Sequence, residues 1–147
     1  MRELAMRLLE IVDAAEPRLR AVSAGESLLP VLRGGWSRRQ VVGHLIDSAS
    51  NNHQRFVRAL LVNALRFPGY DTDGNVRVQA VVEADWLLLV SLWASYNRYL
   101  AHVIGQLPED KLETVCTIAD GEPVTLRFLA MDYVDHLVHH LGQIGVG

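Results

Sequence analysis

The sequence contains very little cysteine, because Cys116 is the only one among its 147 residues. A single cysteine cannot form an intrachain disulfide, and it excludes zinc sites built from several thiolates. Any metal bound by one copy of this chain would therefore use imidazole, carboxylate or water as ligands. Cys116 itself lies in the β-branched segment TVCTI, where we expect a packed thiol and not a nucleophile.

An excess of positive charge is also missing. The 14 Lys and Arg residues are outnumbered by 17 Asp and Glu, which gives a net charge of −3 with neutral histidines. The sequence has no basic stripe with interleaved aromatic residues, so nothing in it predicts nucleic-acid binding.

Long hydrophobic runs are absent as well. The longest, residues 86–94, is interrupted by Ser91, and it is about half the length that crosses a bilayer. The N-terminal residues mix charged and apolar side chains, without the apolar centre of a signal peptide. We therefore expect a cytoplasmic protein that does not bind a membrane.

Hydrophobic residues nevertheless make up 50% of the chain and charged residues 21%, a composition typical of a folded protein. The length suits one hydrophobic core, so we expect a single domain over residues 1–147. Apolar side chains recur at helical spacing in four segments. The predicted helices cover residues 2–22, 37 to about 66, 81–106, and 125 onward.

The boundaries of these helices follow from local signals. Pro17 is expected to kink or end the first helix, and the Gly and Pro residues of 23–35 predict a connector. Ser37 and Gln40 form a capping-box pattern at the start of the second helix. The motif DTDGN at 71–75 lacks the spacing of a calcium loop and is interpreted as a turn. Residues 112–124 have turn and extended character. Because four amphipathic helices account for most of the chain, we expect an all-α fold, a four-helix bundle.

Three of the six histidines fall within MDYVDHLVHHLGQI, residues 131–144. On a helix, His136 and His140 lie one turn apart on one face, and imidazole is a usual ligand for zinc, nickel or iron. His140 lies about 60° and His136 about 100° from the centre of the apolar arc, whereas His139 lies about 160° away. The wheel therefore selects His136 and His140 and places His139 on the surface. Because an HxxxH pair alone is common, a purely structural role stays open.

A third histidine ligand would have to come from another helix. His44 lies on a polar stripe opposite an apolar arc, and this periodicity fits either a solvated face or a wet pocket between helices. His53 lies on the apolar side of the same helix and is expected to pack or to lie in an interface. His102 lies near a helix end, where a cation complements the helix dipole. The polar stripe of His44 also carries Ser48, Asn51 and Arg55.

Three blocks of the chain occur in the order and spacing of a known family: GWSRRQVVGHLIDSASNNHQRFVRAL, LWASYNRYL and TLRFLAMDYVDHLVHHLGQI. They resemble the DinB-like (damage-inducible) helical-bundle superfamily over residues 35–147, and more loosely in the first helix. That superfamily also contains thiol-dependent transferases and a maleylpyruvate isomerase. The resemblance implies a bundle of up-down-down-up topology, commonly in a homodimer.

The resemblance also implies a divalent metal ion, zinc or nickel, held by His44, His136 and His140. Three neutral imidazoles leave a coordination position open, as in catalytic sites. Asp47 and Asp132 lie one helical turn from His44 and His136 and are candidates to accept an imidazole N–H. The remaining candidates for contact with the substrate or the metal ligands are Ser48, Asn51, Arg55 and His139.

The function expected from this resemblance is a metal-dependent hydrolase or thiol S-transferase that acts on a small molecule. Thiol transfer would require a low-molecular-weight thiol, and no residues that recognise such a thiol can be identified in the sequence. The alternative is a non-catalytic metal- or small-ligand-binding protein, or an oligomeric scaffold of the stress-response type. No residue stands out as a general base.

Overall fold

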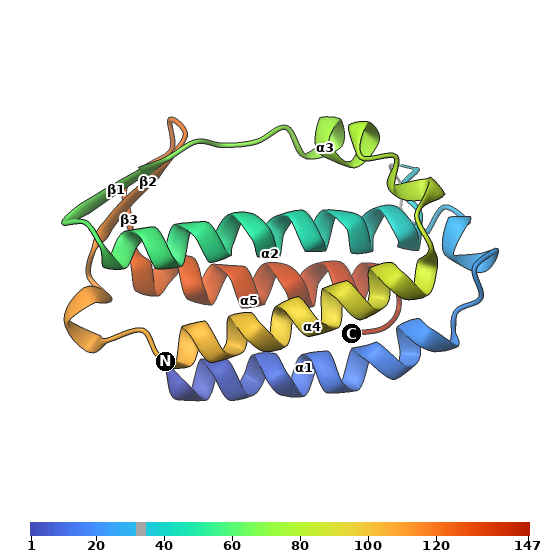
Figure 1. Cartoon of the computed structure of the whole chain (residues 1–147), viewed down its shortest axis with the longest axis horizontal. Helices are drawn as coiled ribbons and strands as arrows, with labels where there is room; N and C mark the ends of the chain where they lie inside the picture. The colour runs from blue at the N-terminus through green and yellow to red at the C-terminus, as the bar shows by residue number, and fades with distance from the viewer. Residues whose placement is uncertain (32–34) are drawn as a thin grey trace.

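Four long helices dominate the computed structural model, which describes residues 1–31 and 35–147 (Figure 1). They are α1 (Arg2–Ala21), α2 (Arg38–Leu60), α4 (Trp86–Gly105) and α5 (Leu126–Gln143). Helix α4 packs against α1 and α2, and α5 packs against the same two helices. Their buried faces form the hydrophobic core, in which Phe56, Trp86, Trp93 and Tyr133 are the largest side chains.

The helices have the expected up-down-down-up topology. In Figure 1, α1 and α5 run in one direction along the bundle, and α2 and α4 run in the opposite direction. The long helices α2 and α4 are consecutive and parallel. The segment between them, residues 61–85, must therefore return along the whole bundle before α4 can begin. We call residues 61–85 the crossover. It carries β1 (Ala64–Phe67), the short helix α3 (Thr72–Val78) and a 3₁₀ turn (Val81–Glu83).

A small sheet at one end of the bundle adds to the predicted helices. Strand β1 pairs in parallel with β2 (Val115–Ile118), and β2 pairs in antiparallel with β3 (Val124–Thr125). This confirms the extended character expected for 112–124. It also explains why the second helix ends at Leu60 and not near residue 66. The backbone of residues 64–67 pairs with residues 115–118, so it cannot continue the helix.

Local capping accounts for the helix starts. Ser37 and Gln40 form the expected capping box, with bonds of 3.3 Å and 3.0 Å. Asp85 caps α4 by accepting the amide of Leu88, so this helix starts at Trp86 and not at 81 as predicted. The turn predicted for 71–75 is wrong, because the Asp71 carboxylate accepts the amide of Gly74 and starts α3.

The first helix and the connector after it largely follow the sequence. Pro17 lies inside α1 and does not end it. The connector 23–35 contains a 3₁₀ turn at Glu26–Leu28, and its residues 32–34 lie outside the described residues. Within residues 1–31 and 35–147, no helix combines the length and apolar character needed to cross a bilayer.

Arg39, in the first turn of α2, is buried and joins two other segments to this helix. Its guanidinium donates to the carbonyl oxygens of Ala24, Val82 and Ala84 at 3.0, 2.8 and 2.9 Å, and to the Ser27 hydroxyl at 3.1 Å. The connector before α2 and the end of the crossover are therefore held to the same helix end.

Candidate metal centre

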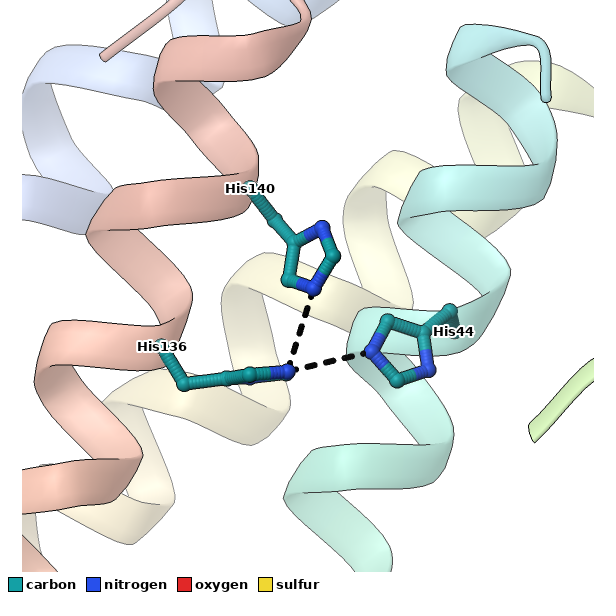
Figure 2. Close-up of side chains that lie close together, drawn as sticks. All are labelled: His44, His136 and His140. Carbon is teal, nitrogen blue, oxygen red and sulfur yellow. Dashed lines mark hydrogen bonds between the residues drawn. The ribbon is translucent and has the colours of Figure 1, made fainter. Parts of the chain in front are cut away.

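The second and the last long helix bring three histidines together (Figure 2). His44 lies in the second turn of α2, and His136 and His140 lie one turn apart on α5. Because α2 and α5 are antiparallel neighbours, the start of α2 lies level with the end of α5. Helical spacing places His136 and His140 on one face of α5, and the topology places that face opposite His44.

The three imidazoles point their Nε2 atoms at one another. The Nε2 atom of His136 lies 3.3 Å from that of His44 and 3.1 Å from that of His140. One ligand nitrogen from each of the three lies within 4.8 Å of the others. A tetrahedral zinc ion with ordinary Zn–N bonds separates its ligand nitrogens by about 3.3 Å. The two separations of 3.3 and 3.1 Å therefore match those around a tetrahedral divalent ion.

Burial keeps the imidazoles neutral at physiological pH. Desolvation, together with the neighbouring histidines, lowers the pKa of His44 to about 4 and that of His136 to about 4. Burial also lowers the pKa of His140, while the nearby Gln143 side chain acts to raise it. Since only the neutral imidazole has a lone pair to offer a metal, the cluster is in its binding form without the loss of a proton.

The Nδ1 atoms of His44 and His140 are buried and have no hydrogen-bond partner among the described residues. A neutral imidazole carries one proton, and a free lone pair on Nε2 places that proton on Nδ1.

The Asp47 carboxylate accepts two hydrogen bonds from Gln79 of the crossover, at 2.9 and 3.0 Å. Asp132 is exposed on α5. The structure thus places Asp47 between α2 and the crossover, and Asp132 at the surface.

The polar stripe of α2 is not a solvated face. His44 is only 4% exposed, and Ser48, one turn further, is equally buried. Asn51 donates to the carbonyl oxygen of Asp47 at 2.9 Å. The solvated-face alternative for His44 is therefore wrong, because α5 and the crossover cover this side of α2.

His139 lies on the exposed side of α5, as the helical wheel predicts, and its Nε2 atom is 2.8 Å from Gln143 Nε2. The other two histidines lie elsewhere on the bundle. His53 packs with its Nδ1 atom 3.1 Å from the Tyr96 hydroxyl, and His102 is exposed and stacks on Tyr99.

Sequence reasoning missed several neighbours of the site. The Trp36 ring lies 5.5 Å from the His44 ring, centroid to centroid. Its position just before the N-cap, where an apolar side chain often packs back on the first turns, was an available signal. Asn52, Phe67 and Tyr70 contact or lie close to Arg55. The last two lie on the crossover, whose path over α2 has no periodic signal.

Comparisons with known proteins agree with this architecture. The family model of the DinB superfamily matches residues 2–144. A protein of Bacillus pumilus (strain SAFR-032), described as a "Putative metal-dependent hydrolase", is 28% identical over 138 residues, which are 94% of this chain and 79% of that protein. The solved structure of YfiT from Bacillus subtilis matches with a TM-score of 0.84 at 24% identity, over 97% of this chain and 82% of YfiT. YfiT is described as a probable metal-dependent hydrolase with an unusual four-helix bundle topology, and at this identity the likeness shows the fold.

Proposed function

The chain belongs to the DinB superfamily, and on that premise we propose that His44, His136 and His140 bind one divalent metal ion and that the protein is a hydrolase acting on a small molecule. The observation that carries the proposal is the convergence of three neutral imidazoles, that of His44 buried and those of His136 and His140 partly buried, with Nε2 separations of 3.1 and 3.3 Å. The descriptions of the Bacillus pumilus relative and of YfiT support the hydrolase activity.

The chemistry suits a catalytic site better than a structural one. A divalent ion held by three histidines supplies Lewis acidity and lowers the pKa of bound water. The chain's own residues hold the imidazoles in place, since both α2 and α5 are packed into the core beside the site. The Trp36 ring and the crossover cover His44 and limit its contact with bulk water. Three neutral ligands leave the charge of the ion uncompensated, which favours an anionic substrate.

Zinc and nickel are the ions we expect, since both bind imidazole well. Thiol S-transfer, with a low-molecular-weight thiol at the same ion, is the alternative reaction. A metal- or small-ligand-binding protein without turnover, or an oligomeric scaffold, is the alternative outside catalysis. An ion that exchanges its water with added ligands favours an enzyme, whereas an inert ion favours the binding protein.

A homodimer, which the family resemblance implies, has a candidate surface on α4. Leu88, Leu92 and Tyr99 are 62%, 46% and 52% exposed. Their spacing of four and seven residues puts them on one face, in the heptad pattern by which helices pack against each other. We propose that this face contacts a second copy. Analytical ultracentrifugation of the wild type and of Leu92→Glu tests this, and a monomeric wild type would contradict it.

Metal content per chain is the decisive measurement. We expect about one divalent ion per chain in the wild-type protein and none in the His136→Ala/His140→Ala variant, by elemental analysis after dialysis. His139→Ala is the matched control, since this neighbouring histidine is exposed and should leave the stoichiometry unchanged. Circular dichroism checks that the variants are folded. A wild-type protein that takes up neither zinc nor nickel would contradict the proposal.

The reaction is then tested with the metal-loaded protein. Carboxylic esters, amides and phosphate esters serve as hydrolase substrates, and glutathione with an electrophilic aryl chloride serves as the thiol-transfer pair. Turnover of the first group that is lost in the double variant supports hydrolysis. Turnover of the second pair alone would replace hydrolysis by thiol transfer.

A further inference from the structure

Arg55 is a cation that the fold holds without a carboxylate. Its side chain is partly buried, and its Nε atom is buried without a hydrogen-bond partner among the described residues. Its recorded side-chain hydrogen bond is a long one, from Nη1 to Asn52 Oδ1 at 3.3 Å. The guanidinium lies over the Phe67 ring of the crossover, with Cζ 5.5 Å from the ring centroid. Four of its five N–H groups therefore have no protein acceptor in the part of the chain that the structure describes.

No acid neutralises this guanidinium at contact distance. Within residues 1–31 and 35–147, the ion pairs of arginine involve Arg7, Arg20, Arg98 and Arg127, and Arg55 is in none of them. Asp132 on α5 is close enough to act on its charge, but burial is the larger influence and lowers the pKa of Arg55. A partly desolvated cation without a counter-ion is costly, and an anion that binds it recovers that cost.

Arg55 lies on the same side of α2 as His44 of the candidate metal centre. Arg55 is eleven residues beyond His44 on α2, which is about 16 Å along the helix and only about 20° around it. The bond to Asn52, three residues earlier, shows that the guanidinium bends back toward His44. Asn52 donates in turn to Ser48, one turn beyond His44. Polar contacts thus run from Arg55 through Asn52 to Ser48, which lies one helical turn from His44.

Tyr70 of the crossover completes this environment. The pKa of its phenol is raised, mainly by burial, so the hydroxyl stays protonated. The Arg55 charge acts in the opposite direction and Asp47 adds to the increase, so both charged groups lie near the phenol. A neutral phenol can donate a further hydrogen bond to an anion. Asp47 and Asp132 disfavour anions nearby, but Asp47 is hydrogen-bonded to Gln79 and Asp132 is exposed to solvent.

We propose that Arg55 binds an oxyanion of the substrate, a carboxylate or a phosphate, while the bond to be cleaved lies at the His44, His136 and His140 site. This inference rests on the proposed function, and it adds the substrate class. The substrate carries a fixed negative group less than about 16 Å from the reacting bond. Arginine suits this role because its planar fork can donate two parallel hydrogen bonds to a carboxylate or phosphate.

Arginine side-chain NMR of the full chain tests the proposal. Acetate and inorganic phosphate are titrated separately into ¹⁵N-labelled protein, with sodium chloride at equal ionic strength as the reference. The Arg55 Nε–H resonance and the backbone amides of Asn52 and Phe67 are followed. Both the metal-free and the zinc-loaded protein are measured, so that anion binding is read independently of metal binding.

We expect a saturable shift of the Arg55 Nε–H resonance with at least one anion, and its relative affinity identifies a carboxylate or a phosphate as the preferred group. In Arg55→Gln, the response of the backbone amides should weaken by at least about tenfold in Kd. Arg58→Gln is the matched control. Arg58 lies over the same ring at 5.7 Å, but it is exposed and bonded to Gln54, so its removal should change the Kd by less than about twofold.

A wild-type Arg55 resonance that responds no more to acetate or phosphate than to chloride would overturn the proposal, and this readout needs no variant to fold. An equal loss of affinity in Arg58→Gln would overturn it as well, by pointing to a diffuse charge effect. Anion binding in a protein that takes up no metal would leave the Arg55 site standing and remove the proposed hydrolase function. Metal binding without an Arg55 response would do the reverse.

Discussion

Gly43, next to His44 on α2, packs closely against Val81 of the crossover. A Cβ atom at this position would lie 2.4 Å from Cγ1 and 2.9 Å from Cγ2 of Val81, so the two cannot coexist in the present arrangement. We predict that Gly43→Ala destabilises the protein, although alanine favours a helix over glycine by about 1 kcal/mol. Overpacking of this kind costs about 1–3 kcal/mol, and the net loss should be about 1 kcal/mol.

A second substitution isolates the contact. Val81→Ala alone removes two buried methyl groups and should cost about 2 kcal/mol. In the double variant the clash with both methyl groups is gone, and only the Val81 Cβ position at 3.2 Å remains to adjust. The new methyl group of residue 43 also fills part of the space. The double variant should therefore lose only about 1 kcal/mol, so that the two changes couple by about 2 kcal/mol.

Urea unfolding of the four proteins in the presence of EDTA measures this coupling as a double-mutant cycle. Metal-free conditions keep changes in ion affinity out of the free energies. Additive effects, with Gly43→Ala more stable than the wild type, would refute the reasoning. Such a result would mean that the crossover moves away from α2 at no cost.

Three further predictions concern charge and polar groups. The metal-free protein should lose stability as the pH falls from 6.5 toward 4, because His44 and His136 have pKa values of about 4 when folded and about 6.5 when unfolded. The unfolded chain then binds more protons, and urea unfolding at pH 7.5 and 5.0 should differ by up to about 2 kcal/mol for each of the two imidazoles, less where solvent screens their charge. A His44→Asn variant should lose about half of this difference. Arg39→Met should cost about 3 kcal/mol in the same assay at pH 7.5, since it removes a buried guanidinium that donates to three partly buried carbonyl groups, and a loss below about 1 kcal/mol would contradict this role. Tyr133→Phe should cost about 1–2 kcal/mol, because Asn97 Oδ1 loses its buried donor, and an unchanged urea midpoint would show that this bond contributes nothing.

Local chemistry made the start of α2 predictable, whereas a partner distant in sequence decided where this helix ends. The capping box of Ser37 and Gln40 lies within four residues, so it is visible in the sequence. The end of α2 depends on β1, whose Leu65 pairs opposite Cys116, 51 positions later. No local pattern contains that pairing. The predicted helix therefore continued to about residue 66.

The residues of the candidate site were also predictable only where local spacing determines their position. The spacing of His136 and His140 on one helix face selected this pair over His139, which the structure places on the surface. The position of His44 followed from the family resemblance only, because periodicity orients a helix toward the core and does not say which helix it meets. Tyr70 went unnoticed because the crossover that carries it has no repeating pattern.

The junction at Arg39 gives the bundle an uneven response to ionic strength. Exposed ion pairs join α1 to its neighbours, through Arg7 with Asp135 and through Arg98 with Asp13, and salt screens such pairs. Arg39 instead is a buried guanidinium that donates to peptide carbonyl groups, so dissolved ions have less access to it. At high salt, amide hydrogen exchange should therefore accelerate along α1 before it does at the start of α2.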